Sequence, residues 1–378
     1  MDKNDIILGY LDKHIDDLLK MLKEAVELES PDHENKTAAD ECSRYFENRY
    51  KELGFRTERI PQETCGDHVY GELGNGKKGA VIIGHYDTVF PIGTIEKMPF
   101  KIEGNRAYGP GILDMKGGLV MAYFAVKALQ ELDMMPDRTI GIFMNGDEES
   151  GSFCSSDQIV DKARQYECAL VMEPGVETIG SVKMKRFGRG TYTIKAIGEE
   201  AHSGSNPHLA ISPITEIARQ LLKIEKMDRE ENDATMAPTV IDGGIYGTCV
   251  IPATASFTMD VRFKTEEVAE RLHDILMNIK PVDERCRIVV DGQIDKPVMI
   301  GDEKLYDRLS KCAEEYDIKP DRIEVGGGSD GNFTAAAGIP TLDGLGMSGK
   351  NLHNADEHIY IDHISRRTAV FARLLKSI

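Results

Sequence analysis

The 378-residue sequence predicts an α/β fold, because short apolar runs alternate with segments of helical periodicity through its first half. Three of the runs are Ala80–Ile83, Thr139–Met144 and Cys168–Met172, and their length and apolar content are typical of buried strands. Carboxylate or imidazole side chains follow closely after each run. Because ligands of open α/β sheets bind beyond the carboxyl ends of the strands, we expect a functional site at one edge of a sheet.

Helices and strands precede and separate these runs. An amphipathic helix is expected from Asn4 to Glu29, because apolar residues recur at helical spacing until Pro31 stops the pattern. The elements expected next are a helix at Thr37–Leu53, strands at Phe55–Ile60 and His68–Leu73, and a helix at Leu119–Leu132. Gly117 and Gly118 stand before the last helix and would allow the backbone to approach a site closely.

The pattern changes after Gly180, where a small α+β domain is expected to be inserted into the first domain. Its expected elements are strands at Ser181–Ile197, Thr239–Tyr246, Cys249–Phe263 and Arg287–Val290 and helices at His208–Lys226 and Thr265–Ile279. We therefore predict a first domain formed by residues 1–179 and 297–378, with residues 180–296 as the insertion. The returning segment is expected to contain a helix at Glu303–Tyr316, a strand near Pro340–Leu345 and a final helix from Ile364.

Composition excludes several classes of protein. The formal net charge is −18 at pH 7 and no basic stripe stands out, which argues against nucleic acid as a partner. No stretch approaches the roughly 18 apolar residues of a membrane span. The seven cysteines include no CxxC pair, and the N-terminus lacks the basic start and apolar core of a signal peptide. We expect a cytoplasmic protein with reduced thiols that binds neither nucleic acid nor a membrane.

The segments that follow the apolar runs contain residue types suited to a metal site. They read GHYDTV from Gly84, YGPGILDMKGG from Tyr108, NGDEESGS from Asn145, MEP from Met172 and LHNADE from Leu352. Histidine and carboxylates are ligands of zinc and similar metals, and no cysteine cluster competes with them. Adjacent glutamates can divide the work, one binding metal and the other acting as a general base. The alternative is that these are ordinary polar residues at strand ends.

HYDTVFP, YGPGILDMKGG, GDEESGS, MEP and LHNADE, in this order, resemble the dizinc exopeptidases and deacylases. That family includes glutamate carboxypeptidase, acetylornithine deacetylase and succinyl-diaminopimelate desuccinylase. HYDTVFPIGT followed by PFKIEGNRAYGPGILDMKGG is most similar to the glutamate carboxypeptidase branch, and the resemblance covers almost the whole chain. It implies a mixed-sheet catalytic domain and an inserted lid domain through which two chains form a homodimer.

The resemblance implies a site for two divalent metal ions, with zinc expected and cobalt or manganese as alternatives. Asp114 would bridge the two ions. His85 and Glu173 would complete one metal site, and Glu149 and His353 the other. A loop histidine on the surface is the alternative for His353.

Asp87 and Glu148 are the expected catalytic residues. Asp87 lies two residues after His85, so on an extended segment both side chains point the same way, and Asp87 would orient the imidazole. A polar loop residue without a role is the alternative for Asp87. Glu148 would act as the general base, taking a proton from water and passing it to the leaving amine.

Two residues of the inserted domain match the family's substrate-binding positions. His202 in EEAHSG resembles the lid histidine that reaches the site from the partner chain, and Arg262 in MDVRF resembles the arginine that binds a substrate carboxylate. A polar turn residue and a solvent-facing strand residue are the respective alternatives. Cys249 stands where the family usually has asparagine, which puts one polar contact to substrate in doubt.

The resulting hypothesis is an enzyme that hydrolyses an amide bond and releases a C-terminal amino acid, glutamate or a similar one, from a peptide or N-acyl conjugate. A deacylase of N-acyl amino acids, of the acetylornithine deacetylase or desuccinylase type, is the alternative within the class. An inactive scaffold protein would have lost Glu148 or a metal ligand, and none is lost. A single-metal lyase or phosphatase is a further alternative, which metal content would distinguish.

Overall fold

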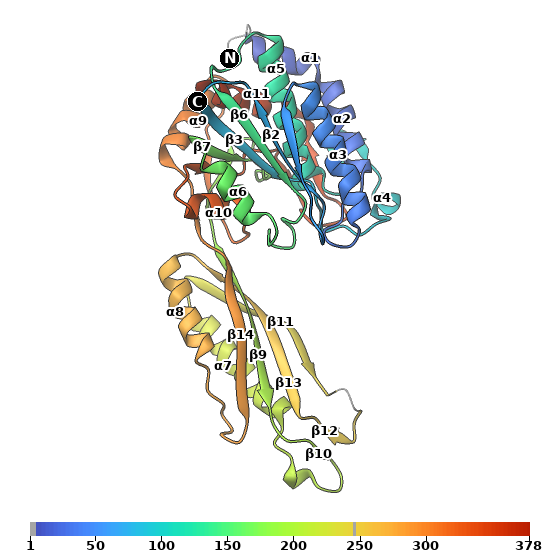
Figure 1. The fold of residues 1–378 in the computed structure, drawn as a ribbon, viewed down its shortest axis with the longest axis vertical. Helices are drawn as coiled ribbons and strands as arrows, with labels where there is room; N and C mark the ends of the chain where they lie inside the picture. Colours follow the sequence, from blue (N-terminus) through green and yellow to red (C-terminus); the bar gives the residue numbers. More distant parts are fainter. Residues whose placement is uncertain (1–4, 245–246) are drawn as a thin grey trace. The chain divides into compact units, whose positions relative to one another are not determined.

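The computed structural model describes residues 5–244 and 247–378, which form two compact units (Figure 1). The first unit consists of Met1–Lys185, Met299–Val325 and Ser329–Ile378, and the second of Arg186–Val298 and Gly326–Gly328. The second unit is therefore inserted into the first along the chain. Asn4, the predicted start of the first helix, and Tyr246, the predicted end of a strand, lie outside the described residues.

A six-stranded mixed sheet runs through the first unit. Its strands are β1 (Arg56–Ile60), β2 (His68–Leu73), β3 (Lys78–His85), β6 (Thr139–Asn145), β7 (Cys168–Val171) and β17 (Thr341–Leu342). They lie in the order β1-β2-β6-β3-β7-β17. β3 is parallel to both neighbours, β6 and β7, whereas β2 is antiparallel to β6. β3, β6 and β7 therefore end at one edge of the sheet, as the α/β prediction requires.

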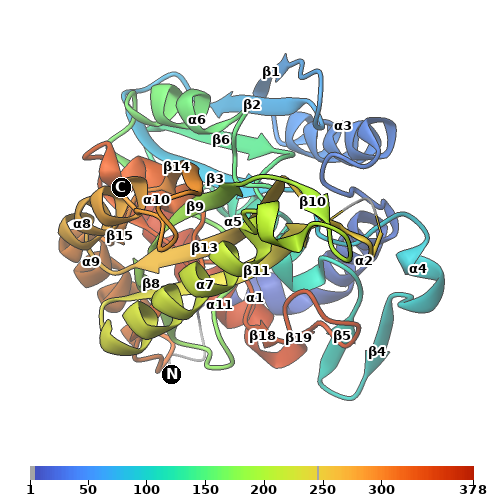
Figure 2. The same cartoon turned by 90° about the horizontal axis from the view of Figure 1, so that it is seen from below.

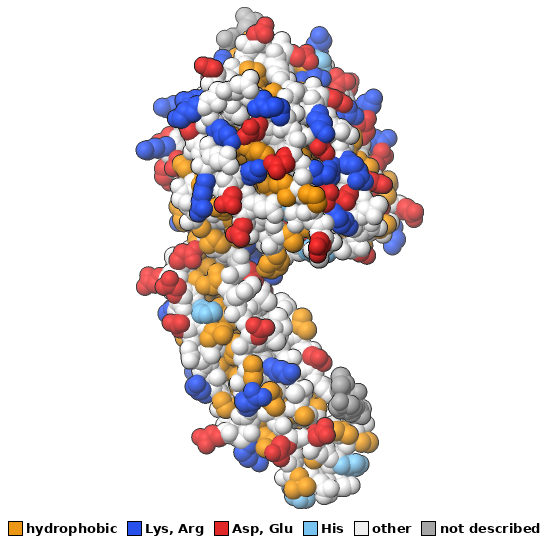
Figure 3. All heavy atoms as spheres, viewed as in Figure 1, with side chains coloured by type: hydrophobic (Ala, Val, Ile, Leu, Met, Phe, Trp, Pro, Cys, Tyr) orange, Lys and Arg blue, Asp and Glu red, His pale blue; other side chains and the backbone are white. Residues whose placement is uncertain are grey.

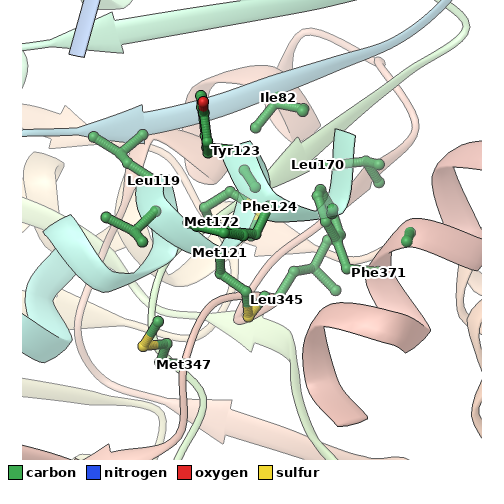
Figure 4. Packing of buried hydrophobic residues seen from close by; sticks show 14 of the residues in the cluster. Ile82, Leu119, Met121, Tyr123, Phe124, Leu170, Met172, Leu345, Met347 and Phe371 are labelled. Carbon is green, nitrogen blue, oxygen red and sulfur yellow. The ribbon is translucent and has the colours of Figure 1, made fainter. Parts of the chain in front are cut away.

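The side chains of the central strands alternate between two apolar clusters, one on each face of the sheet. Ile82 and Leu170 belong to the larger cluster, whereas Val81, Ile83 and Val171 belong to the smaller one. This period of two is what a strand buried on both faces produces. Figure 4 shows part of the larger cluster, in which side chains of the helix that contains Leu119 lie among those of the sheet and of the C-terminal helix.

Helices cover both faces of this sheet. Those that contribute to the larger cluster are α1 (Ile6–Lys13), α2 (Ile15–Glu27), α3 (Lys36–Glu52), α5 (Gly117–Glu131), α9 (Glu303–Glu314) and α11 (Ile361–Ser377). α6 (Ser156–Ala163) contributes to the smaller cluster, and α10 (Asp330–Ala336) lies against it. A short helix, α4 (Thr94–Lys97), precedes strand β4 (Lys101–Glu103).

The structure differs from the sequence-based prediction at the first helix. The single helix expected there is two helices, α1 and α2, separated by His14, whose φ of −105° and ψ of 18° are not helical. The His14 ring stacks on Tyr10 with centroids 4.3 Å apart, and its Nδ1 lies 2.9 Å from Asp17 Oδ2. These local contacts stabilise the non-helical conformation of His14, which the apolar periodicity of the sequence does not reveal.

The strand expected at Ser181–Ile197 is also broken, at Phe187, into β8 (Ser181–Arg186) and β9 (Gly188–Ile197). β8 lies in a three-stranded sheet between β15 (Met299–Ile300) and β16 (Asp321–Val325). A further sheet of the first unit has the order β18-β19-β5-β4, in which the new strands are β5 (Arg106–Tyr108), β18 (Gly349–Lys350) and β19 (His358–Tyr360).

The second unit is a four-stranded antiparallel sheet with two helices. Its strands are β9, β11 (Ala234–Gly243), β13 (Thr254–Phe263) and β14 (Arg287–Lys296), in the order β11-β13-β9-β14. Its helices are α7 (Pro213–Glu230), which lies across β11 and β13, and α8 (Glu266–Met277), which lies against β14 (Figure 2). A separate two-stranded ribbon joins β10 (Ala201–His202) to β12 (Val250–Ile251). This α+β unit has its own apolar core.

Acidic and basic side chains are interspersed over the face of the molecule drawn in Figure 3. That face has no continuous basic stripe, in agreement with the net charge of −18. Among residues 5–244 and 247–378, no helix is long and apolar enough to cross a membrane.

Gly118 brings the start of α5 against the end of β7. A Cβ atom at Gly118 would lie 2.1 Å from the carbonyl oxygen of Met172, and this oxygen belongs to the backbone. Gly118 therefore permits a close contact between the backbone that follows Asp114 and the backbone that precedes Glu173.

Gly118→Ala is expected to lower the free energy of unfolding by about 1–3 kcal/mol, because backbone must move to admit the methyl group. Urea unfolding of the chelator-treated protein measures this. Gly9→Ala is the matched control, since Gly9 lies within α1 and nothing lies within 4 Å of its added Cβ. That change should raise the free energy of unfolding by about 0.5–1 kcal/mol. Equal stability of wild type and Gly118→Ala would contradict the close contact.

Candidate metal centre

Three adjacent parallel strands present the candidate residues at one edge of the main sheet. His85 is the last residue of β3 and is buried. Glu148 and Glu149 follow β6 by a few residues, and Glu173 follows β7. Because β3 pairs with both β6 and β7, their carboxyl ends lie side by side. The sheet therefore brings an imidazole and three carboxylates to one place.

Asp114 lies between two imidazoles. It belongs to the segment Ile112–Lys116, which leads into α5, and its φ of −115° and ψ of 100° are not helical. Its Oδ1 lies 3.2 Å from His85 Nε2, and its Oδ2 lies 3.2 Å from His353 Nε2. His353 comes from the loop between β18 and β19 and has a φ of 60°. One carboxylate thus faces two separate histidines, one with each oxygen.

Two groups of potential ligands share Asp114. The first is His85, Asp114 and Glu173, and the second is Asp114, Glu149 and His353; within each group, one donor atom per residue lies within 4.8 Å of the others. Glu173 Oε1 lies 3.4 Å from His85 Nε2, and Glu149 Oε1 lies 3.4 Å from His353 Nε2. Each imidazole therefore faces one shared and one separate carboxylate.

Burial and mutual repulsion shift the pKa values of these carboxylates. Burial, followed by the Asp114 charge, raises the pKa of Glu149 to about 8. For Asp114, burial acts in the same direction, but hydrogen bonds from His353 and His85 outweigh it and hold its pKa well below the ordinary value. The facing carboxylates of Asp114 and Glu149 raise the pKa of His353 to about 11. The carboxylates thus require positive charge between them.

The donor set fits divalent metal ions. Imidazole nitrogens and carboxylate oxygens are ligands of zinc and related ions, and each group offers three of them. Among the described residues, Glu149 Oε1 is buried without a hydrogen-bond partner, and its 3.4 Å separation from His353 Nε2 leaves it available to a cation. A buried carboxylate oxygen without a partner is costly unless a ligand satisfies it. The geometry is therefore that of two adjacent cation sites with one bridging carboxylate.

Asp87 connects the ends of β3 and β6. Its Oδ1 lies 3.4 Å from His85 Nδ1, and its backbone oxygen lies 3.1 Å from the same nitrogen. Its Oδ2 accepts a hydrogen bond of 2.9 Å from the backbone N–H of Glu149. Asp87 therefore contacts the side of the imidazole that faces away from Asp114, and it also fixes the backbone of a second candidate ligand.

Glu148 lies between Asp147 and Glu149 in the loop after β6, and its side chain is 8% exposed. Its backbone oxygen accepts a hydrogen bond of 2.8 Å from the N–H of Gly151, which turns the chain there. Asp147 is fully buried and points into the protein, where its Oδ2 accepts from the backbone N–H of Cys154 at 2.7 Å. Of the three acidic residues in this loop, Asp147 is the one whose carboxylate is bound by backbone N–H groups inside the protein.

Glu357 binds the backbone that presents Asp114, and the sequence did not predict this role. Its Oε1 accepts from the backbone N–H groups of Leu113 and Asp114 at 2.7 and 3.1 Å, and its Oε2 accepts from that of Gly111 at 3.3 Å. Burial, with a smaller contribution from Asp114, raises the pKa of Glu357 to about 8. Its position in LHNADE was part of the recognised motif, but no local pattern reveals contacts across more than 240 residues.

Lys183 is a second residue whose environment the sequence did not reveal. It lies in the basic segment Lys183–Arg186. Lys183 is buried, and its Nζ lies 3.7 Å from Glu173 Oε2, whereas the side chain of Lys185 is 57% exposed. The segment thus contains both a buried partner of Glu173 and a solvated lysine.

His202 lies in the second unit, exposed, on the short strand β10. Its Nδ1 accepts hydrogen bonds from the backbone N–H groups of Gly204 and Ser205 at 3.1 and 3.0 Å. In the neutral ring the proton must therefore be on Nε2, which makes that nitrogen a donor. Cys249 is exposed beside this turn, and its backbone oxygen accepts from the N–H of Ser203 at 2.9 Å.

Arg262 is half-buried on β13 in the same unit. Its Nε and Nη2 donate to the two oxygens of Asp260 at 2.6 and 3.0 Å, and its Nη1 donates to the backbone oxygen of Gly326 at 3.3 Å. One edge of the guanidinium is thus occupied by Asp260. The other edge, between Nη1 and Nη2, still has N–H groups for a second carboxylate.

Comparison with known proteins agrees with this geometry. The profile of peptidase family M20/M25/M40 matches residues 81–377. The chain is 29% identical over 376 residues to carboxypeptidase G2 of Pseudomonas sp. (strain RS-16), covering 95% of this chain and 88% of that protein. It is 27% identical over 349 residues to succinyl-diaminopimelate desuccinylase of Rhodospirillum centenum, covering 86% of this chain and 88% of that protein.

Among solved structures, that of aminopeptidase PepT from Bacillus cereus has the same fold, with a TM-score of 0.78 at 20% identity over 96% of this chain and 98% of that chain. The fold, the paired ligand groups around Asp114 and the extent of the family match agree with one another. The chain therefore belongs to peptidase family M20/M25/M40 and is a metal-dependent hydrolase.

Proposed function

We propose that this enzyme hydrolyses the amide bond before a C-terminal amino acid, glutamate or a similar one, in a peptide or N-acyl conjugate. The observation that carries the proposal is the pair of ligand groups that share Asp114, with Glu148 beside them in the sequence. The similarity to carboxypeptidase G2, which extends over 95% of the chain, supports the direction of cleavage.

In this proposal His85, Asp114 and Glu173 would hold one ion, and Asp114, Glu149 and His353 would hold a second. Zinc is the expected metal, and cobalt or manganese would suit the same nitrogen and oxygen ligands. When bound, two divalent cations supply Lewis acidity, which polarises an amide carbonyl and makes a water molecule easier to deprotonate. Asp87 acts through His85, because it fixes the ring whose other nitrogen faces Asp114.

Glu148 is the proposed general base. It takes a proton from the attacking water and returns that proton to the nitrogen of the leaving amine, so that one side chain serves both steps. The placement of its two acidic neighbours supports this role, because Asp147 points into the protein and Glu149 faces His353.

His202 and Arg262 bind the substrate in this proposal. The Nε2–H of His202 donates to the oxyanion that develops on the carbonyl oxygen. Arg262 uses its remaining guanidinium edge to bind the terminal carboxylate, while Asp260 holds the other edge. Cys249 stands at the position where the family usually has asparagine, and the neighbouring Thr248 would supply the polar contact to substrate in its place.

A homodimer through the second unit is part of the proposal. β11 is an edge strand of its sheet, and Val240 and Ile241 on this strand are 58% and 67% exposed. Exposed apolar residues on an edge strand, whose outer side has no neighbouring strand, favour association with another chain. We also infer a cytoplasmic location from the unpaired cysteines.

A deacylase of N-acyl amino acids is the second candidate. The similarity to succinyl-diaminopimelate desuccinylase, which extends over 86% of the chain, favours it. The two activities use the same residues around Asp114 and differ in which side of the amide is recognised.

A hydrolysis screen separates the two candidates. The metal-loaded enzyme is given N-acyl amino acids and short peptides that vary independently in the acyl group and the C-terminal residue, and amine release is measured. We expect kcat/KM for C-terminal glutamate to exceed that for its carboxamide-blocked form by on the order of tenfold or more, because a charged hydrogen bond contributes about 1.5–3 kcal/mol. Arg262→Ala should remove this preference. Preference for one acyl group across many amino acids would instead identify a deacylase.

Glu148→Gln and Asp114→Ala are expected to separate catalysis from metal binding. Glu148→Gln should keep the wild-type metal content and lower kcat by roughly 10²–10⁴-fold, because the proton acceptor is lost. Asp114→Ala should lose both ions, since both groups share this carboxylate. Elemental analysis after dialysis measures metal, and steady-state kinetics measures kcat. Normal turnover by Glu148→Gln would exclude it as the base, and full metal content in Asp114→Ala would exclude the bridge.

His202→Ala is expected to lower kcat by roughly 10²–10³-fold with metal content unchanged, because an oxyanion donor is lost. Mixed dimers of His202→Ala with Glu148→Gln test whether His202 acts across the dimer. If it does, a chain with intact Glu148 receives His202 from its partner and activity returns. Mixed dimers as inactive as both parents would place His202 in its own chain's site.

A further inference from the structure

A third group of metal-binding side chains lies beneath the loop that presents Glu148. It consists of Cys65, His68 and Asp147, all fully buried, with one donor atom from each within 4.8 Å of the others. It shares no residue with the two groups around Asp114. The donor atoms of this group are therefore as close to one another as those of the two groups around Asp114, and one of them is a thiol sulfur.

The strand pairing explains why these residues meet. His68 begins β2, and Asp147 follows the end of β6. β2 and β6 are antiparallel, with Val69 opposite Met144, so the start of one lies beside the end of the other. Cys65 belongs to the segment that enters β2. The cluster thus joins three segments at one point.

His68 has the environment of a ligand rather than of a core histidine. Both ring nitrogens are buried and, among the described residues, neither has a hydrogen-bond partner. Nε2 lies 4.0 Å from Asp147 Oδ1, which is too far for a hydrogen bond but suitable for two atoms on either side of one ion. Buried imidazoles are normally hydrogen-bonded, so an ion at this position would satisfy an otherwise unpaired nitrogen.

Asp147 is fixed with one oxygen turned toward His68. Its Oδ2 accepts from the backbone N–H groups of Cys154 and Ser155 at 2.7 and 3.2 Å. Within the described part of the chain, its Oδ1 receives only a long hydrogen bond of 3.4 Å from Asn145 Nδ2. A carboxylate held in this way by backbone donors is pre-oriented for a ligand at the other oxygen.

Cys154 supplies a fourth donor. Its backbone N–H donates to Asp147 Oδ2 at 2.7 Å, and its thiol lies 3.7 Å from the hydroxyl of Thr64, the neighbour of Cys65 in the sequence. It is half-buried, which gives access from solvent. Two sulfurs, one nitrogen and one oxygen form a four-donor set that suits tetrahedral zinc, and this metal binds both thiolates and imidazole. A disulfide between Cys65 and Cys154 is the competing arrangement, but it would leave both nitrogens of His68 unpaired.

We propose that Cys65, His68, Asp147 and Cys154 form a structural zinc site, distinct from the two ions around Asp114. The ion would tie the segment before β2 to the loop after β6. Since Glu148 and Glu149 directly follow Asp147, this site would fix the start of the loop that presents them. The thiols would bind as thiolates and release their protons on metal binding.

Cobalt spectroscopy tests the proposal with a signal that the site around Asp114 cannot give. Sulfur bound to Co²⁺ produces an intense near-ultraviolet charge-transfer band, whereas nitrogen and oxygen ligands do not. Metal-free protein prepared under reducing conditions is titrated with Co²⁺. We expect the band to appear with about one equivalent per chain and to persist in Asp114→Ala, which lacks the bridging carboxylate. This separates the result from the proposed peptidase function.

Cys65→Ser and His68→Asn should each abolish the band and lower the bound cobalt by about one ion per chain. Cys42→Ser is the matched control, because Cys42 is equally buried but belongs to no such cluster, and it should keep the band. Cys249→Ser should also keep it, which excludes binding at the exposed thiol. Circular dichroism verifies that each variant is folded.

The wild-type protein alone can overturn the proposal, so it does not depend on the folding of any variant. Absence of a thiolate–cobalt band in wild type would refute the site. Titration of thiols in the denatured protein gives a second measurement. Seven reactive thiols are expected, whereas five in protein purified without reductant, together with no band after reduction, would identify a disulfide and exclude the zinc site.

Discussion

The carboxylate of Asp114 between two imidazoles is the interaction on which the centre depends. Its two oxygens face His85 and His353 at equal distances of 3.2 Å, and each half of the site is incomplete without it. Glu357 fixes the backbone that presents Asp114, and Asp87 fixes the ring on one side of it. These supporting contacts fix the orientation of the carboxylate that both groups of potential ligands share.

Acidic side chains are packed closely around Asp114. Glu149 and Glu357 are both buried near Asp114, and burial raises the pKa of each to about 8. Like charges that approach in a region of low dielectric are unfavourable unless cations lie between them. Metal ions that bind the folded chain therefore stabilise it in proportion to the logarithm of their concentration.

The sequence predicted the strands β3, β6 and β7 and the residues after them, because a buried strand and a polar strand end are both local patterns. It predicted the α+β insertion for the same reason. The break at His14 and the division at Phe187 were missed, since apolar periodicity continues through both positions. The contacts of Glu357, Lys183 and His68 could not be predicted, because each depends on a segment brought close only by the fold.

Chain order has a consequence for synthesis. Asp114 meets His353 across 239 positions, and Glu357 reaches back 243 positions to the same residue. A nascent chain emerges from its N-terminus, so the main strands are present long before these partners. Until the last segment arrives, the carboxylate that joins both halves lacks one imidazole and its backbone support. The group around Asp114 is therefore completed only by the last part of the chain, and a cut before His353 would remove one imidazole while leaving every strand of the six-stranded sheet in the chain.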